Sequence, residues 1–264
     1  MRVLVEYIGK NTVDFISYCG GLFSLFFASS YWFTKIVSRQ VRFQLSNLFF
    51  QMVRVGVNSI PIVALVLLFV GMILAFQLSG ILKDFGVLEY VANVISVSIF
   101  RELGPLLACI VMSGFVGASF AAEIGTMVVG EEVEALRTQA IDPVRFLVVP
   151  RLLATMIMVP CLVILGDLIG VLGGFIIGTT ILDIGPVLYW NKTLEDLTLS
   201  DFFQGLIKSE VFAIIITLIA CYEGFKVKGG AEGVGKCTTI TVVLSIVFII
   251  VADCYFAALF YYIW

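Results

Sequence analysis

Five long stretches of this sequence contain few or no charged residues, and each is long enough to cross a lipid bilayer as a helix. A helix needs about 20 apolar residues to cross roughly 30 Å of hydrocarbon. The stretches are residues 57–79, 103–122, 152–181, 203–224 and 239–263. The chain has a mean hydropathy of +1.10, and 61% of its residues are hydrophobic. Because backbone polar groups must be paired within a bilayer, the sequence predicts an all-α integral membrane protein with five transmembrane helices.

Two further apolar stretches are ambiguous. Residues 13–33 are nearly long enough to cross, but they contain a Gly-Gly pair and several serines and end in Tyr-Trp-Phe, which favours a helix lying at the membrane interface. Residues 87–100 are too short to cross alone. We expect them to lead into the span at 103–122 as a bent segment.

The distribution of basic residues indicates the orientation. With five spans and a cytoplasmic N-terminus, 12 of the 16 Lys and Arg residues fall on the cytoplasmic side, as the positive-inside rule requires. The C-terminus is then periplasmic. If residues 13–33 also crossed, the chain would start outside while the later loops kept their sides, and the charge distribution argues only weakly against that alternative.

Composition excludes several kinds of function. The chain has no histidine, which removes the commonest zinc sites and His-based catalysis, and we predict no metal site. Its six cysteines are scattered through apolar runs without a C-x-x-C pair, so we interpret them as packing residues. A net charge of −3 without a basic run argues against nucleic acid as a partner. The N-terminus lacks the pattern of a cleaved signal peptide.

Several ionisable residues lie in or beside the predicted spans, where a charge costs at least about 2.5 kcal/mol on insertion scales. They are Arg101, Glu102, Asp167, Lys208, Glu210 and Asp253. Asp253 has no Lys or Arg within ten residues along the chain, so its partner must come from another helix. Two interpretations stay open: these residues form buried ion pairs that only orient helices, or they form a polar ring in an apolar cavity that meets a charged lipid headgroup.

The longest charged segment lies between the second and third spans. Apolar residues recur there at helical spacing, namely Ile124, Met127, Val128, Val133, Leu136 and Ala140. Glu131, Glu132, Glu134 and Arg137 mostly face away from that stripe. The pattern predicts one amphipathic helix of about 20 residues over 123–142, ended by Asp142–Pro143. It is either a solvated connection or, as its length favours, a docking surface.

The third span carries a stripe of small residues. Gly166, Gly170, Gly174 and Gly178 recur every four residues, which lets a neighbouring helix approach closely. We expect helix packing within the subunit or across a dimer.

The combination "AAEIGTM…E…ALRTQAIDPVRFLVVPRLLA", with "RELGPLL" before it and "GVGKCTT" after it, resembles the MlaE (YrbE) family of ABC-transporter permeases. That family moves phospholipids between the inner and outer membranes of Gram-negative bacteria. The resemblance implies a single permease domain over 1–264, with an N-terminal cytoplasmic and interfacial region at 1–55 and a transmembrane core at 56–264. It further implies a homodimer in the inner membrane, two cytoplasmic ABC ATPase subunits and a periplasmic MCE-domain substrate-binding protein.

The resemblance also assigns roles to residues. It implies a lipid cavity lined by Leu74, Ile81, Leu82 and Phe85, although some relatives have an aromatic hydroxyl where Phe85 stands. Polar residues near that cavity correspond to Arg101, Glu102, Lys208 and Asp253. The segment at 123–142 corresponds to the helix that couples to the ATPase, with Glu123, Met127, Glu131, Glu134, Leu136, Arg137 and Asp142 as its coupling residues.

The expected function is therefore that of a permease subunit and not of an enzyme. "GGAEGVGKCTT" departs from the phosphate-binding loop G-x-x-x-x-G-K-[ST], because Cys237 replaces the hydroxyl residue and the glycine spacing differs. We expect no cofactor in this chain, with ATP and magnesium bound by the partner ATPase. Two rivals remain: an ion-coupled secondary transporter that uses Asp253 and Glu102, and a membrane scaffold that transports nothing.

Overall fold

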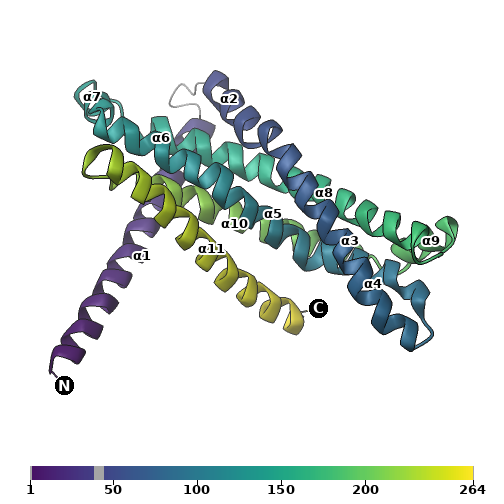
Figure 1. Ribbon diagram of the computed structural model, residues 1–264. Helices are drawn as coiled ribbons and strands as arrows, with labels where there is room; N and C mark the ends of the chain where they lie inside the picture. The colour runs from purple at the N-terminus through teal and green to yellow at the C-terminus, as the bar shows by residue number, and fades with distance from the viewer. Residues whose placement is uncertain (1, 39–44, 264) are drawn as a thin grey trace.

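A computed structural model describes residues 2–38 and 45–263, and within these ranges the regular elements are helices. Figure 1 shows long helices lying side by side, with α7 and α9 at opposite ends of the molecule. The α-helices are α1 (Arg2–Val37), α2 (Leu45–Val55), α3 (Ile60–Asp84), α4 (Val91–Ser98), α5 (Gly104–Met112), α6 (Ala118–Val129), α7 (Glu132–Thr138), α8 (Val149–Thr180), α9 (Pro186–Glu195), α10 (Leu199–Phe225) and α11 (Gly230–Ile263).

The five predicted spans are all present as long apolar helices. Helix α10 lies at the centre of the bundle, where it contacts α5, α6, α8 and α11, while α3 packs along α8. Six helical stretches of the described chain are long and apolar enough to cross a membrane. They are Thr12–Ile36, Leu45–Asp84, Leu88–Val129, Val144–Thr180, Leu199–Phe225 and Gly230–Tyr262. The protein is therefore a multi-pass membrane protein.

The additional candidate span is the apolar part of α1. Only 12% of its apolar window is buried within the subunit. Figure 1 shows α1 crossing the other helices obliquely, with its N-terminal half projecting away from them. The interfacial placement of residues 13–33 stays a prediction.

The second span begins earlier than the sequence predicts. Helical structure is nearly continuous from Leu88 to Val129, so Arg101 and Glu102 lie inside the helix and do not open it. A π-helical turn, η3 (Ile99–Leu103), precedes Pro105. Proline lacks an N–H and clashes with the carbonyl four residues before it, and the wider π turn accommodates both effects. The apolar segment at 87–100 does lead into this span, as expected.

The glycine stripe of α8 packs against elements of the same subunit. A side chain at Gly166 would overlap Leu67 of α3, and one at Gly170 would approach the Leu67 carbonyl oxygen at 3.3 Å. Gly174 and Gly178 make room for the ring of Tyr189 in α9. The expectation of helix packing within the subunit is confirmed.

The predicted single helix over 123–142 is wrong. Helix α6 continues out of the span to Val129, and the short helix α7 begins only at Glu132. Glu131 between them has a left-handed backbone with φ of 60°, which a continuous right-handed helix excludes. Gly130 before it has φ of −81°, so the left-handed position at this helix end falls on Glu131 and not on the glycine.

Asp142–Pro143 does not end this segment, because α7 already ends at Thr138. The Asp142 carboxylate instead accepts the backbone N–H of Val144 at 2.8 Å, at the start of the next helical turn, η5 (Val144–Val148). An aspartate in this position satisfies a donor that the first turn of a helix leaves unpaired. Asp142 therefore begins the third span.

Candidate functional site

Three of the charges predicted to need partners meet in one cluster inside the bundle. The Lys208 ammonium on α10 forms ion pairs with the Glu102 carboxylate on η3 and, at 2.9 Å, with the Asp253 carboxylate on α11. We call these three residues the Lys208 triad. Lys208 is completely buried, and the Asp253 side chain is 11% exposed, whereas that of Glu102 is 37% exposed. The triad joins three helices and presents only the Glu102 carboxylate to the surface of the subunit.

The charge balance of the triad is uneven. Two carboxylates share a single ammonium, so the cluster carries an excess of one formal negative charge when all three groups are ionised. A buried charge needs pairing to be tolerated, and the two pairs formed by Lys208 provide it. The exposed oxygen of Glu102 is where a further polar group could approach.

Arg101 does not join the triad. Its side chain is 46% exposed, and its guanidinium lies 4.0 Å from the carboxylate of Asp201. Asp201 belongs to the capping box that starts α10, where Thr198 and Asp201 bond to each other's backbone. The neighbouring residues Arg101 and Glu102 thus point to different partners.

The four residues expected to line a lipid cavity divide between two environments. Leu74 and Leu82 pack against the apolar cluster that α3 forms with α4 and α8. Ile81 and Phe85 are 59% and 77% exposed. The surface that α3 offers outside the subunit is formed instead by another row of apolar side chains, namely Ile62, Leu65, Phe69, Ile73 and Phe76.

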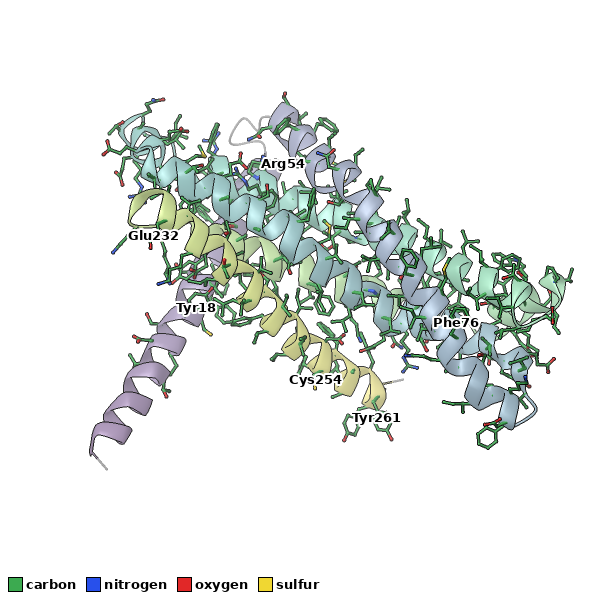
Figure 2. All side chains as sticks on the ribbon, viewed as in Figure 1. Tyr18, Arg54, Phe76, Glu232, Cys254 and Tyr261 are labelled. Atoms are coloured by element: carbon green, nitrogen blue, oxygen red, sulfur yellow. The ribbon has the colours of Figure 1, made fainter. Side chains whose placement is uncertain are left out.

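A second ion cluster joins α2, α6 and α8. The Glu123 carboxylate lies 2.6 Å from the Arg54 guanidinium and 3.0 Å from that of Arg151, which also donates to the Leu147 carbonyl oxygen. The Arg151 side chain is only 4% exposed. Figure 2 shows Arg54 where α2 meets the helices beside it. Glu123 therefore joins three helices through its ion pairs, while its side chain stays 32% exposed. Its role in coupling to an ATPase stays a prediction.

The other predicted coupling residues lie further along. Glu131, Glu134 and Arg137 are exposed, and Arg137 pairs with Glu134 at 3.3 Å. Met127 and Leu136 are partly buried. The exposed acidic surface expected for this region exists, but it belongs to the short helix α7 and the residue before it.

Asp142 connects this region to α1. Its second carboxylate oxygen accepts the indole N–H of Trp32 at 3.2 Å, and the Arg145 guanidinium lies 5.6 Å from the Trp32 ring. A hollow of about 570 Å³ lies beside this contact, with Arg137, Asp142 and Phe225 among its lining residues. The loop after α7, the end of α10 and the C-terminal part of α1 thus form one surface.

Asp167 is separate from both clusters. It is 3% exposed on α8, and its Oδ1 atom has no hydrogen-bond partner among the described residues. That oxygen packs against Gly104, where any side chain would overlap it. The close approach explains why a glycine precedes Pro105 in this span.

Sequence reasoning found the membrane charges but not all of their partners. It did not single out Arg54, Arg151 or Asp201, because each lies near the end of a span where a charge costs little. Arg151 follows Pro150 at the start of an apolar run, and this position was the available signal. The sequence also did not predict α9, whose Tyr189 packs against Gly174 and Gly178 of the glycine stripe.

A bundle of long apolar helices with paired charges at its centre defines a multi-pass membrane protein. The chain belongs to the MlaE permease family, whose model, "Permease MlaE", matches residues 48–259. It is 40% identical to a probable ABC transporter permease protein of Rickettsia prowazekii, over 98% of each chain. It is 32% identical to the intermembrane phospholipid transport system permease protein MlaE of Haemophilus influenzae, over 90% of each chain. It is also 33% identical to the chloroplastic protein TRIGALACTOSYLDIACYLGLYCEROL 1 of Arabidopsis thaliana, over 80% of this chain and 60% of that protein.

Proposed function

We propose that this chain is the permease subunit of an ABC transporter that moves phospholipids between the inner and outer membranes. It acts as a homodimer in the inner membrane, with a cytoplasmic N-terminus and a periplasmic C-terminus. Two ATPase subunits bind ATP and magnesium on the cytoplasmic side, and an MCE-domain protein exchanges lipid on the periplasmic side. The name of the Haemophilus influenzae relative supports the substrate class.

The Lys208 triad is the observation that carries this proposal. A lysine buried completely between two carboxylates inside a membrane bundle is a costly arrangement, and such residues often mark a substrate pathway. The partly exposed Glu102 carboxylate gives the triad access to a lipid headgroup beside the bundle. Ile81 near the end of α3 and Phe85 directly after it add exposed apolar surface for acyl chains.

Helix α7 supports the ATPase part of the proposal. It carries exposed carboxylates at one end of the molecule. It follows α6, which the Glu123 cluster ties to α2 and α8, and it precedes Asp142, which bonds to Trp32 of α1. A movement of α7 is therefore transmitted to α2, α6, α8 and α1. We assign α7 with Glu131 as the surface that receives the ATPase.

The ion-coupled alternative requires carboxylates that exchange a cation. Both acidic residues that it would use, Glu102 and Asp253, are paired with Lys208. That pairing disfavours the alternative, because an incoming proton or sodium ion would have to compete with the ammonium. The scaffold alternative predicts no lipid transfer, so a measurement of lipid transfer distinguishes it from the proposal.

The proposal is tested by purifying the chain in mild detergent from the cells that produce it. The proteins that co-purify are identified, and the lipid that remains bound is analysed. We expect an ATPase to co-purify and phospholipid to be retained, with ATP-dependent lipid transfer after reconstitution. Transport that proceeds without an ATPase and follows an ion gradient would establish the ion-coupled alternative. A chain that transfers no lipid with its ATPase bound would establish the scaffold.

A further inference from the structure

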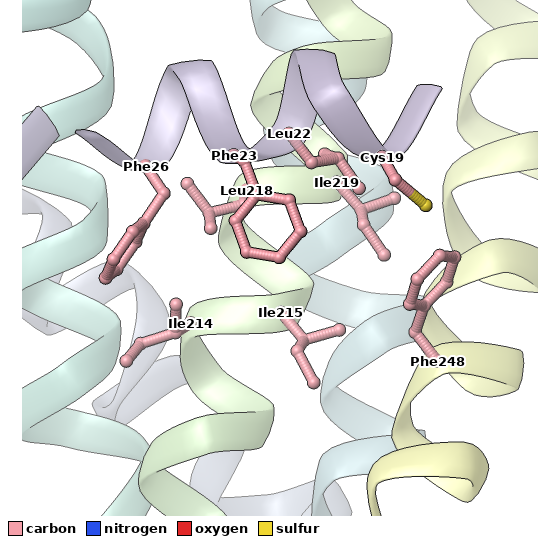
Figure 3. A pocket seen from close by; sticks show the side chains of 9 residues that line it. All are labelled: Cys19, Leu22, Phe23, Phe26, Ile214, Ile215, Leu218, Ile219 and Phe248. Atoms are coloured by element: carbon pink, nitrogen blue, oxygen red, sulfur yellow. The ribbon is translucent and has the colours of Figure 1, made fainter. Parts of the chain in front are cut away.

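An apolar groove lies on the outer side of the bundle where α1 crosses α10. It has a volume of about 260 Å³ and lies between α1, α10 and α11 (Figure 3). Its apolar lining includes Cys19 of α1, Ile215 and Ile219 of α10, and Phe248 of α11. We call this the α1 groove. It shares no residue with the Lys208 triad or with the predicted lipid cavity.

One end of the α1 groove carries a lysine held by two aromatic rings. Tyr18, next to Cys19, packs edge-on against Tyr222 with ring centroids 5.1 Å apart. The Lys226 ammonium lies 4.7 Å and 4.0 Å from the centroids of these two rings. Figure 2 places Tyr18 where α1 meets the rest of the chain. The groove therefore ends at a positioned cation.

The depth of the groove matches one leaflet of a bilayer. At 1.5 Å per residue, Ile219 lies about 10 Å and Ile215 about 17 Å along α10 from Lys226. One leaflet contributes about 15 Å, half of the roughly 30 Å hydrocarbon thickness. A chain that starts at Lys226 and reaches Ile215 thus extends over about the depth of one leaflet.

The headgroup end favours a negative charge. Lys226 and Lys228 are both exposed, whereas the neighbouring Glu223 is only 9% exposed. Aromatic faces can bind a quaternary ammonium such as choline, but here the Lys226 ammonium already lies against the Tyr18 and Tyr222 rings. The site is therefore unsuited to the cationic part of a headgroup. It suits a phospholipid whose headgroup has a net negative charge.

We propose that the α1 groove binds one acyl chain of an anionic phospholipid, whose phosphate pairs with Lys226. The bound lipid fills the space between α1 and the α10–α11 pair. This matters because α1 buries little of its own surface in the subunit yet contacts Asp142 through Trp32. The lipid thereby stabilises α1 against the surface next to α7.

The test uses the full chain in phosphatidylcholine nanodiscs that contain a small fraction of a photoactivatable phospholipid. Two probes carry the same diazirine acyl chain, one on phosphatidylglycerol and one on phosphatidylcholine. After irradiation, labelled peptides are identified by mass spectrometry. We expect phosphatidylglycerol to label residues 214–219 at least threefold more than phosphatidylcholine, and both probes to label the exposed surface around Ile250 equally.

Two variants and one control sharpen the result. Ile215→Trp fills the groove and is expected to reduce its labelling at least threefold, while Lys226→Gln removes the preference between the two probes. Ile250→Trp is the matched control, because it adds the same bulk to an exposed position of α11 about 200° around the helix from Phe248. It is expected to leave groove labelling unchanged.

Equal labelling of the groove by both probes would show ordinary bilayer contact and overturn the proposal. Absence of labelling by either probe would show that the groove is filled by protein, which also overturns it. The experiment measures no transport, so its outcome is independent of the proposed function.

Discussion

Lys208 is held by two carboxylates from different helices. The effect of replacing Lys208 therefore depends on whether the two carboxylates are replaced as well. Lys208→Met leaves Glu102 and Asp253 without a cation, and breaking a buried pair in this way costs about 3 kcal/mol or more. The triple variant with Glu102→Gln and Asp253→Asn removes all three charges and is expected to recover most of that loss. Thermal unfolding followed by tryptophan fluorescence measures both.

Lipid transfer by the same variants separates the two interpretations of the triad. If the charges only orient helices, the triple variant regains both stability and transfer. We expect it to regain stability but not transfer, because the headgroup loses its polar partner. Lys236→Met, on the exposed start of α11, is the control and should alter neither measurement.

Glu123 gives a second prediction, which distinguishes a structural residue from a surface one. Glu123→Gln leaves the buried Arg151 guanidinium without a carboxylate, and we expect a loss of about 1–3 kcal/mol in the free energy of unfolding. Glu131→Gln, on the exposed surface before α7, should leave stability nearly unchanged. Equal stability of the two variants would show that the Glu123 cluster contributes little.

The cost of burying charge predicted which residues needed partners, but not which partners they take. Asp253 had to pair with another helix, and Lys208 was already a candidate, yet nothing in the sequence separated Arg101 from Glu102. Their different partners follow from the π-helical turn that carries them and from the position of α10. Such contacts depend on helix packing, which one sequence does not specify.

At the level of the element, the lengths of the apolar stretches predicted the spans. The periodicity of apolar residues did not predict how the helix over 123–142 is divided. The stripe from Ile124 to Ala140 suggested one helix because spacing alone does not detect left-handed residues, and two of them, Glu131 and Ala140, lie in this segment. Glu131 changes the helix direction, although it is not a residue type that favours the left-handed region. The π turns were equally unpredicted, although Pro105 marked a place where regular α-helix was disfavoured.

The assignment of α7 as the ATPase-binding element predicts the effect of reversing its charge. Replacing Glu131, Glu132 and Glu134 with lysine is expected to lower ATPase co-purification at least tenfold, because the exposed carboxylates are the surface offered to the partner. The chain itself should keep its thermal stability, since these side chains make few contacts with the core. Affinity purification with quantification of the bound ATPase measures the effect.

The matched control reverses the same number of charges elsewhere. Asp183, Glu195 and Asp196 lie at or near α9, at the other end of the molecule from α7. Their replacement with lysine should leave ATPase binding intact. If both variants bound the ATPase as well as the unmodified chain, α7 would not be its docking element.

At the scale of the whole molecule, α3 packs along α8 within the subunit. Its opposite side carries a row of large apolar side chains that no other helix of the described chain covers. In lipid such a row does not by itself drive association. We place this row near the two-fold axis of the proposed homodimer, so that a lipid cavity could form between the two copies of α3. An axis of that kind brings the same residue of both copies together.

A single cysteine on α3 tests this arrangement. Phe69→Cys is expected to form a disulfide-linked dimer on mild oxidation in membranes, because Cα atoms less than about 7 Å apart can be bridged. Leu172→Cys on α8 is the control of similar exposure, at 47% against 52% for Phe69, and should stay monomeric. Both are made after replacing the three native cysteines that are not fully buried with serine, namely Cys19, Cys161 and Cys254. Cross-linking through Leu172 but not Phe69 would move the dimer interface to α8 and separate α3 from any cavity between two copies.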